Sequence, residues 1–558
     1  MESAQWWLWC WWTHPLSTFF SVLALILFHS IITYRVWPKL RFRSLTQRFP
    51  GPPTHPLLGH NLLEMAEGEE KILDKIMEWR QRYGSCFCVW YTSSIPTLII
   101  ADPELVKQFF SSKIDVDYYG KGYEYEFRPF LGQSILLSWG NQWRKKRRIM
   151  SPAFYSANLK QLYHVFTSGS LRLVQNWQQQ LQLQQKNKKA NKEEQQYFDL
   201  EDLSVELKKC SLDMIGVAGF GFSFSNASTK NEEEHETKDD NNEEAIVRDF
   251  EMVLSEIERR SYDFISWPNW TYCNVLPRGR KFMKGVRNIQ SLVDGIIQQR
   301  RRKMMIEETS LDASSTKDLL DLLLAAKDEE TGEVLTDKQI QEEVMTFMFA
   351  GHETTSISLS WTLYLLAKHP KVEEKLMQEI DNVLGATRGI PHYDDLPKLE
   401  YLESVLQESM RLFPPQPAFV RKALKDNHIG DVYIPGGTEV SVVPYLIHRD
   451  EHYWPEPLLF DPDRFCKENK KGRHSFSYLP FSGGLRSCIG KPFALMEAKV
   501  LLSVILYHFS ITLESTAEVF AIPAVTLRPH GLRVQVHLRH KRGVKNSVLY
   551  KNQTSQQN

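Results

Sequence analysis

The stretch FSGGLRSCIG at residues 481–490 decides the fold of this chain, and the helical pattern KPFALMEA follows it at residues 491–498. Cys488 therefore stands just before the first turn of a predicted helix, where amide groups and the positive end of the helix dipole favour a thiolate over a thiol. The glycines at 483, 484 and 490 let the backbone approach a flat ligand and donate hydrogen bonds to sulfur. A buried structural cysteine is the more common case, so the interpretation depends on the rest of the sequence.

A long central helix is the second feature. Thr336 and Gln339 form a capping box, and the helical pattern continues for about 32 residues, or about 48 Å, until Pro370 stops it. Midway lies the segment AGHETT at residues 350–355. A glycine inside a helix costs about 1 kcal/mol, which indicates a packing or ligand reason for Gly351. A kinked core helix is the alternative interpretation of this segment.

Three further motifs place charged or aromatic residues at fixed spacing. They are Glu408-x-x-Arg411, FDPDRF at residues 460–465, and Trp143-x-x-x-Arg147, with Arg421 ten residues after Arg411. Each is weak alone, because pairs at i,i+3 or i,i+4 are common on solvated helices.

Together these motifs resemble the cytochrome P450 superfamily, in its usual order. Phe481, Gly484, Arg486, Cys488 and Gly490 match its heme-binding loop F-x-x-G-x-R-x-C-x-G, and AGHETT matches its A-G-x-[DE]-T-[TS] signature. The resemblance covers roughly residues 50 to 540. It implies a mainly α fold with small β-sheets (α+β) and a heme b (iron protoporphyrin IX) held by a thiolate, which favours O–O cleavage.

The resemblance also implies a role for each motif. Cys488 is the expected axial ligand of the heme iron, and Glu353 and Thr354 are the expected proton-delivery pair. The heme carboxylates are expected to meet four residues, since buried carboxylates need such partners: Trp143, Arg147, Arg421 and Arg486. A structural cluster is expected from Glu408, Arg411 and Arg464, with Asp463 standing where the family usually has glutamate.

Composition excludes some other classes. The 558 residues carry 68 Lys+Arg and 68 Asp+Glu, so the formal net charge is zero and a generic nucleic-acid binder is disfavoured. Seven cysteines, an odd number at wide spacing, argue against a disulfide scaffold. No C-x-x-C pair occurs, which argues against structural zinc.

The N-terminal region predicts a membrane anchor. No Lys, Arg, Asp or Glu occurs between Glu2 and Arg35, and residues 16–34 are long enough for one tilted transmembrane helix. A Trp-rich segment at residues 1–15 precedes it, and basic residues follow it, so the positive-inside rule places the body in the cytosol. We therefore expect a single-pass protein of the endoplasmic reticulum membrane with a lumenal N-terminus.

The remaining boundaries follow from composition. Residues 35–56 are expected to form a basic, Pro-rich linker, and residues 57–540 the catalytic domain. The polar stretches 178–196 and 226–244 cannot bury enough apolar surface and are expected to be disordered insertions. Residues 541–558 are a polar tail.

Partners and substrate are less specified. A basic patch beside the thiolate would attract an acidic electron donor, which the resemblance implies is NADPH–cytochrome P450 reductase, helped by cytochrome b5. Its expected members are Arg144, Lys145, Lys146, Arg148 and Lys491; ordinary solvated charge is the alternative.

The segment FMFAGHETT at residues 347–355 resembles the fatty-acid ω-hydroxylase branch, and plant-type hormone and terpenoid hydroxylases share much of it. Ala350 replaces the glutamate that esterifies the heme in many members of that branch, so no covalent link is expected. The expected function is hydroxylation of a lipophilic substrate, such as a fatty acid, sterol or terpenoid. Two alternatives are a heme-thiolate isomerase or dehydratase acting on hydroperoxides, which the Glu353–Thr354 pair disfavours, and a non-enzymatic membrane protein.

Overall fold

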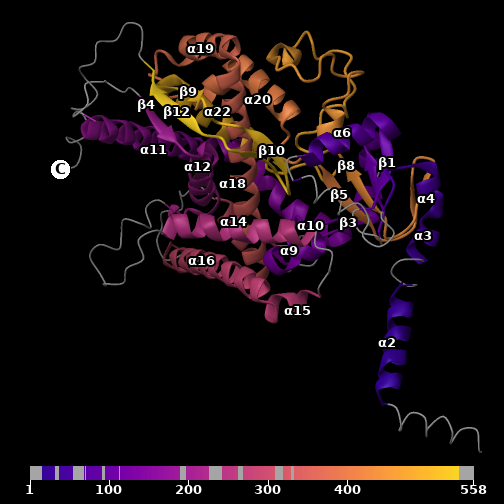
Figure 1. Ribbon diagram of the computed structural model, residues 1–558. Coiled ribbons are helices and arrows are strands. Elements are labelled where there is room, and N and C mark those ends of the chain that lie inside the picture. The colour runs from indigo at the N-terminus through magenta and orange to yellow at the C-terminus, as the bar shows by residue number, and fades with distance from the viewer. Residues whose placement is uncertain are drawn as a thin grey trace, which may run out of the picture.

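The computed structural model describes residues 15–31, 37–54, 68, 71–90, 95–111, 114–188, 197–224, 242–261, 268–307, 318–327, 332 and 334–539. The Trp-rich segment up to residue 14, nearly all of the insertion at 226–244 and the tail at 541–558 lie outside these residues. The described chain is mainly helical with small sheets, as predicted (Figure 1).

The predicted central helix is present as α18, Asp337–Lys368. It begins with the expected capping box, in which the Thr336 amide donates to Gln339 Oε1 at 2.9 Å and the Gln339 amide donates to Thr336 Oγ1 at 3.3 Å. Figure 1 shows α18 running through the middle of the body. Packed against it are α12 (Leu203–Phe220), α20 (Glu400–Leu412) and α22 (Lys491–His508). Nearly the whole length of α18 is therefore buried.

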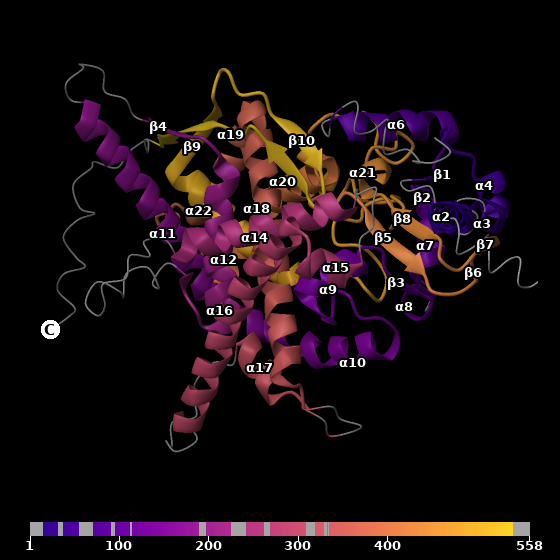
Figure 2. The same ribbon diagram turned by 60° about the horizontal axis from the view of Figure 1, so that its bottom comes forward.

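The outer helices cover this centre. They are α9 (Glu124–Leu131), α10 (Gly140–Met150), α11 (Ser156–Lys188), α14 (Asn242–Ser261), α15 (Asn269–Asn274), α16 (Pro277–Glu307), α17 (Leu319–Ala325) and α19 (Pro370–Leu384). Figure 1 shows α14 and α16 side by side, and Figure 2 shows α12 between α11 and α18. Residues 178–188, expected to be disordered, instead form the last turns of α11, because Gln and Lys sustain a helix that packing has already started.

The largest sheet has the strand order β1-β2-β8-β5-β3. Its strands are β1 (Cys86–Val89), β2 (Thr97–Ile100), β3 (Tyr119–Lys121), β5 (Phe419–Ala423) and β8 (Glu439–Val442). Three smaller sheets join β4 (Tyr197–Leu200), β12 (Val534–Leu538) and β9 (Phe509–Leu513); β6 (Asn427–Ile429) and β7 (Val432–Ile434); and β10 (Phe520–Pro523) and β11 (Leu527–His530). Short helices complete the described fold: α6 (Ile72–Tyr83), α7 (Pro103–Ser111), α8 (Ile114–Asp117), α21 (Pro444–Ile447), η3 (Ser151–Phe154), η4 (Tyr393–Lys398) and η5 (Pro462–Phe465).

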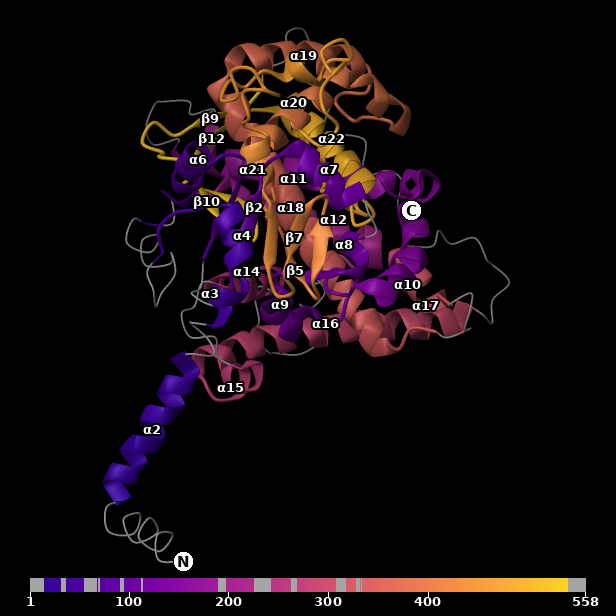
Figure 3. The same cartoon turned by 90° about the vertical axis from the view of Figure 1, so that its right-hand side faces the viewer.

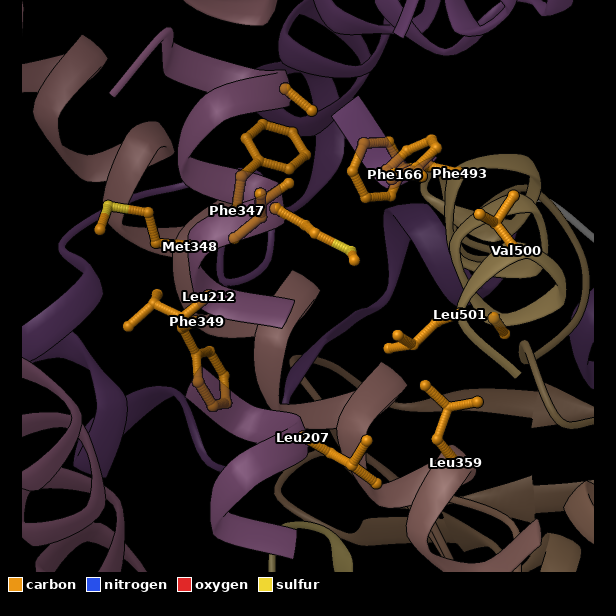
Figure 4. Packing of buried hydrophobic residues seen from close by; sticks show 14 of the residues in the cluster. Phe166, Leu207, Leu212, Phe347, Met348, Phe349, Leu359, Phe493, Val500 and Leu501 are labelled. Carbon is orange, nitrogen blue, oxygen red and sulfur yellow. The ribbon is translucent and has the colours of Figure 1, made fainter. Parts of the chain in front are cut away.

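Two apolar clusters hold the body together. The larger one surrounds α12, α18 and α22, and Figure 4 shows Phe347, Met348 and Phe349 of α18 within it. The smaller one lies around the five-stranded sheet and includes Phe87, Phe109 and Val440. The division places α18 in the larger cluster, and β5 and β8 in the smaller one.

The N-terminal region consists of α2 (Pro15–Ile31), α3 (Trp37–Arg41) and α4 (Arg43–Arg48). Figure 3 shows α2 standing apart from the body. Within the described ranges, no helix combines the length and the apolar character that crossing a membrane requires. The expected linker at 35–56 is in part a packed element, because Phe42 and Leu45 are buried and Arg48 Nη2 pairs with Asp431 Oδ2 at 2.7 Å.

Candidate active site

Cys488 lies in the loop that leads into α22, and its amide donates to the Phe481 carbonyl at 3.0 Å. The side chain is exposed, yet desolvation by surrounding protein is the largest influence on its pKa and raises it. The Gly490 and Lys491 amides and the Arg147 guanidinium lower that pKa, as expected at a helix start, without offsetting the desolvation. The Cys488 sulfur is therefore accessible to a ligand and at the same time desolvated by the protein around it.

Two of the loop glycines have a packing reason. Gly484 has φ +66°, and a Cβ there would lie 2.2 Å from the Phe110 carbonyl oxygen. A Cβ at Gly483 would lie 3.1 Å from the Phe110 ring. These two glycines are therefore needed for packing against α7, whereas a Cβ at Gly490 would face the Cys488 sulfur at 3.9 Å.

Arg486, Trp143 and Arg147 gather beside Cys488, as the motifs predict. The Arg486 guanidinium lies 5.3 Å from the centre of the Trp143 ring and donates through Nη2 to the Ser138 carbonyl at 2.5 Å. Arg147 donates through Nη1 to the Ser487 carbonyl at 2.9 Å. The Nη1 of buried Arg486 has no hydrogen-bond partner among the described residues.

Arg421 reaches the same region from β5, where it pairs through Nε with Asp115 Oδ1 at 2.8 Å. Opposite it in the antiparallel register of β3 lies Lys121. Desolvation, followed by the charges of Arg421 and Arg486, holds the pKa of Lys121 well below its usual value, while Asp115 and the Cys488 thiolate raise it. Lys121 therefore belongs to the site, although no sequence motif marks it.

The excess of basic side chains in this cluster favours an anionic ligand. Its cations are Lys121, Arg147, Arg421 and Arg486, and the acid paired within it is Asp115. Desolvation, then Arg421, lowers the pKa of Arg486 to about 9. Buried cations need anionic partners. The two carboxylates of a heme would supply them, and the accessible sulfur would supply the iron ligand.

Glu353 is buried in the middle of α18 with partners from two other elements. Lys208 Nζ on α12 pairs with its Oε2 at 3.4 Å, and Thr526, between β10 and β11, donates to its Oε1 at 3.1 Å. Lys208 also pairs with Glu251 Oε1 of α14 at 3.2 Å. Burial alone would raise the pKa of Glu353, but Lys208, then His352 and Arg528, outweigh it and hold the pKa below its usual value.

Thr354 occupies a different side of the helix. Its hydroxyl donates to the Ala350 carbonyl at 2.9 Å, and both residues are half-buried, as is Gly351, whereas residues 343–349 and 355–363 are buried. Since they are four residues apart, they share one helix face. The neighbouring Gly351 has a packing reason, because a Cβ there would approach Ile215 Cγ1 of α12 to 3.0 Å.

The predicted structural cluster is assembled. Arg411 binds Glu408 through two hydrogen bonds of 2.7 and 2.8 Å, and Arg464 Nε lies 3.5 Å from Glu408 Oε1. Arg411 also donates to the carbonyls of His448, Pro457 and Leu459. Asp463 pairs with Lys375 instead.

The expected basic patch is smaller than predicted. Lys146 is buried and pairs with Glu343 Oε1 of α18 at 2.5 Å, so it faces the interior. Arg144 pairs with Asp117 at 2.5 Å. The basic residues of α10 are thus divided between the core and the surface, where Lys145 and Arg148 remain at least partly exposed. Lys491, at the start of α22, is exposed as well.

An accessible cysteine at a helix start, a cluster of basic side chains beside it, and an acid and an alcohol in a central helix are features expected of a heme-thiolate enzyme. Comparison with known proteins agrees. The family model described as Cytochrome P450 matches residues 49–536. The chain therefore belongs to the cytochrome P450 family and is a cytochrome P450 monooxygenase.

Curated relatives match over most of their length. Cytochrome P450 4V2 of Pongo abelii is 31% identical over 93% of this chain and 94% of its own. Cytochrome P450 4B1 of Rattus norvegicus is 30% identical over 86% and 88%. Cytochrome P450 4c21 of Blattella germanica is 32% identical over 88% and 93%.

Proposed function

We propose that this enzyme hydroxylates a lipophilic substrate, a fatty acid, sterol or terpenoid, with dioxygen and electrons passed from NADPH by a reductase. The observation that carries the proposal is the combination of accessible Cys488 with the half-buried face of α18 at Ala350 and Thr354. Bound heme b, with Cys488 as its axial ligand, would supply the activation of dioxygen.

The remaining chemistry belongs to side chains of the chain itself. Lys121, Arg147, Arg421 and Arg486 would neutralise the heme carboxylates, with Trp143 stacked on Arg486 to fix its guanidinium. Ala350 offers no carboxyl for a covalent ester, so the heme is proposed to be held without one.

Proton delivery is proposed for Glu353 and Thr354. Lys208 keeps Glu353 ionised and links it to Glu251, whose side chain is 37% exposed. A proton that arrives from solvent at Glu251 would thus reach Glu353 through Lys208. The Thr354 hydroxyl would then hold that proton at the half-buried face of α18. Such positioning keeps bulk water away from the reacting centre.

The membrane anchor, the reductase and cytochrome b5 are also part of the proposal. Apolar side chains of α2 are exposed, among them Phe19, Leu25 and Phe28, which supports burial in a lipid phase of the endoplasmic reticulum membrane. The exposed cations Arg148 and Lys491 support docking of an acidic electron donor.

Two measurements test the proposal. The ferrous carbon monoxide complex is expected to show the absorption of a thiolate-ligated heme. With reductase and a lipid library, NADPH consumption is expected to yield hydroxylated products of one lipid class. A protein that converts lipid hydroperoxides without NADPH would contradict it and favour the isomerase or dehydratase.

A further inference from the structure

Glu343, near the start of α18, is a fully buried acid with partners from two other segments of the chain. Its two carboxyl oxygens accept from the Ile135 amide at 3.0 and 2.9 Å, and Oε1 also pairs with Lys146 Nζ of α10 at 2.5 Å. Desolvation raises the pKa of Glu343, and Lys146 and then the Ile135 amide oppose that shift. A buried carboxyl group depends on such partners, so Glu343 ties two segments to α18.

The first of these segments is a turn that ends against the loop leading into α22. The Ser138 amide donates to the Ser134 carbonyl at 2.8 Å and closes a turn that contains Ile135. The Ser138 carbonyl, at the end of this turn, accepts from Arg486 Nη2 at 2.5 Å. Because Glu343 holds the turn at Ile135, it also fixes the carbonyl group that Arg486 binds.

The second segment is α10, which contacts the same loop one residue after Lys146. Arg147 Nη1 donates to the Ser487 carbonyl at 2.9 Å. Since Lys146 is held by Glu343 on α18, the helix cannot rotate about its axis without breaking that pair, and the direction of Arg147 is fixed with it. The two contacts of Glu343 therefore lead to neighbouring positions of one loop, at Arg486 and Ser487.

We propose that Glu343 is a positioning residue that holds Arg147 and Arg486 in place for the heme carboxylates. It acts through Lys146 on α10 and through Ile135 in the turn at residues 134–138. The consequence for heme rests on the function proposed above for the two arginines, whereas the mechanical link from Glu343 to the loop does not. An ion pair that only stabilised the fold would leave heme binding unchanged in a folded protein.

Hydrogen exchange in the holoenzyme tests the mechanical link. In Glu343→Gln, the side-chain amide carries no charge to hold the ammonium group of Lys146 in the interior. We therefore expect faster amide exchange in peptides that cover residues 134–138 and 481–490, where turn hydrogen bonds protect the wild type. Wild-type exchange of residues 481–490 in this variant would overturn the proposal.

Glu342→Gln is the matched control, because it makes the same change one residue earlier on α18. The Glu342 side chain accepts from the exposed Gln133 amide at 3.1 Å, which lies outside the turn that ends at Ser138. We expect wild-type exchange of residues 481–490 in this variant. Equal acceleration in Glu342→Gln and Glu343→Gln would also count against the proposal, because it would reflect a general loosening of α18.

Heme transfer to an apo-globin acceptor tests the consequence for the site. We expect a several-fold faster transfer from Glu343→Gln than from the wild type, at temperatures equally far below the two unfolding midpoints. Arg539→Met is the stability control, since it breaks a partly buried ion pair with Glu373 of α19. Transfer from Glu343→Gln no faster than from Arg539→Met would overturn the positioning role.

Lys146→Met is the second variant if Glu343→Gln does not fold. It releases α10 from α18 but leaves the Ile135 amide on the Glu343 carboxyl group. Faster exchange of residues 481–490 and faster heme transfer are expected here too. Wild-type values of both would contradict the proposal.

Arg147→Met and Arg486→Met separate this inference from the proposed function. If both variants transfer heme at the wild-type rate, the heme-carboxylate role of the two arginines fails. The exchange of residues 481–490 in Glu343→Gln then still decides whether Glu343 positions the loop.

Discussion

Lys208 Nζ and Glu353 Oε2 lie 3.4 Å apart in the interior, and this pair sets the charge of the proposed proton donor. The charges around Glu353 come from α12, α14, α18 and β11: Lys208, Glu251, Glu258, His352 and Arg528. Burial raises the pKa of Glu258 to about 7, against the opposing charge of Arg528. The cluster therefore has a group that titrates near neutral pH beside one that stays ionised.

Lys208→Met should raise the pKa of Glu353, because burial then dominates. We expect Glu353 to be protonated at higher pH than in the wild type, so the acidic limb of the pH profile for product formation moves upward. The measurement is product per NADPH across about pH 5–9, the range in which such donor groups titrate. Lys209→Met, which removes a cation paired with Glu206 on the same helix, is the control. An unmoved profile in Lys208→Met would contradict the assignment.

Cys488→Ser should abolish the thiolate absorption of the ferrous carbon monoxide complex and with it the turnover, because an alcohol is a poor replacement for a thiolate ligand. Cys466→Ser is the matched control in the described chain, as its sulfur lies 3.6 Å from Asp463 Oδ1, at the end of η5. Wild-type absorbance in Cys488→Ser would reject Cys488 as the ligand.

Arg411→Ala should destabilise the protein by about 3–5 kcal/mol, since it leaves the fully buried Glu408 without its main counter-charge. Arg411→Lys should rescue little, because an ammonium cannot reproduce the two-pronged geometry. Thermal unfolding of the holoenzyme measures the loss. The control Arg533→Ala removes a half-exposed pair with Glu514 and should change stability by about 0–1 kcal/mol. Equal losses of stability in the two alanine variants would contradict the structural role of the cluster around Glu408.

Lys121→Met should weaken heme retention while leaving the fold intact, because one cation for the heme carboxylates is lost. Transfer of heme to an apo-globin acceptor is expected to accelerate several-fold. Lys107→Met, at an exposed pair with Glu104, serves as the control. Retention equal to wild type would place Lys121 outside the heme site.

Glu497→Gln should become increasingly stabilising relative to wild type as pH rises from about 4.5 to about 8. The folded-state pKa lies above the unfolded one, so the native protein binds the extra proton and loses stability across this window. The gain is on the order of 4 kcal/mol, at about 1.4 kcal/mol per pH unit. Unfolding midpoints in denaturant at several pH values measure it. A pH-independent difference would show that the carboxyl is not buried as a neutral acid.

Local spacing was sufficient to predict α18, its capping box and the Glu408–Arg411 pair, because helix geometry turns sequence separation into position. Two separate motifs predicted a shared ligand for Arg486 and Trp143, but not the direct contact between these two side chains. Lys121 could not be predicted, because it depends on the register between β3 and β5, which are far apart in the chain.

Other differences arise from tertiary packing. Lys146 was expected at the surface, and only the position of Glu343 on α18 explains why it points inward. Gly483 and Gly484 were predicted to matter for a ligand, and the structure adds that they accommodate Phe110 of α7. Residues 178–188 have a disordered composition and still continue α11, since extending an existing helix is easier than starting one.

Residues 37–54, which precede the catalytic body, limit how that body can turn. A Cβ at Gly51 would fall 1.8 Å from the Cys88 carbonyl oxygen, so this stretch lies directly on the backbone of β1. Turning the body about residues 37–54 would require Phe42 and Leu45 to leave their buried positions and Arg48 to release Asp431. The catalytic body therefore cannot pivot at this stretch without partly unfolding it.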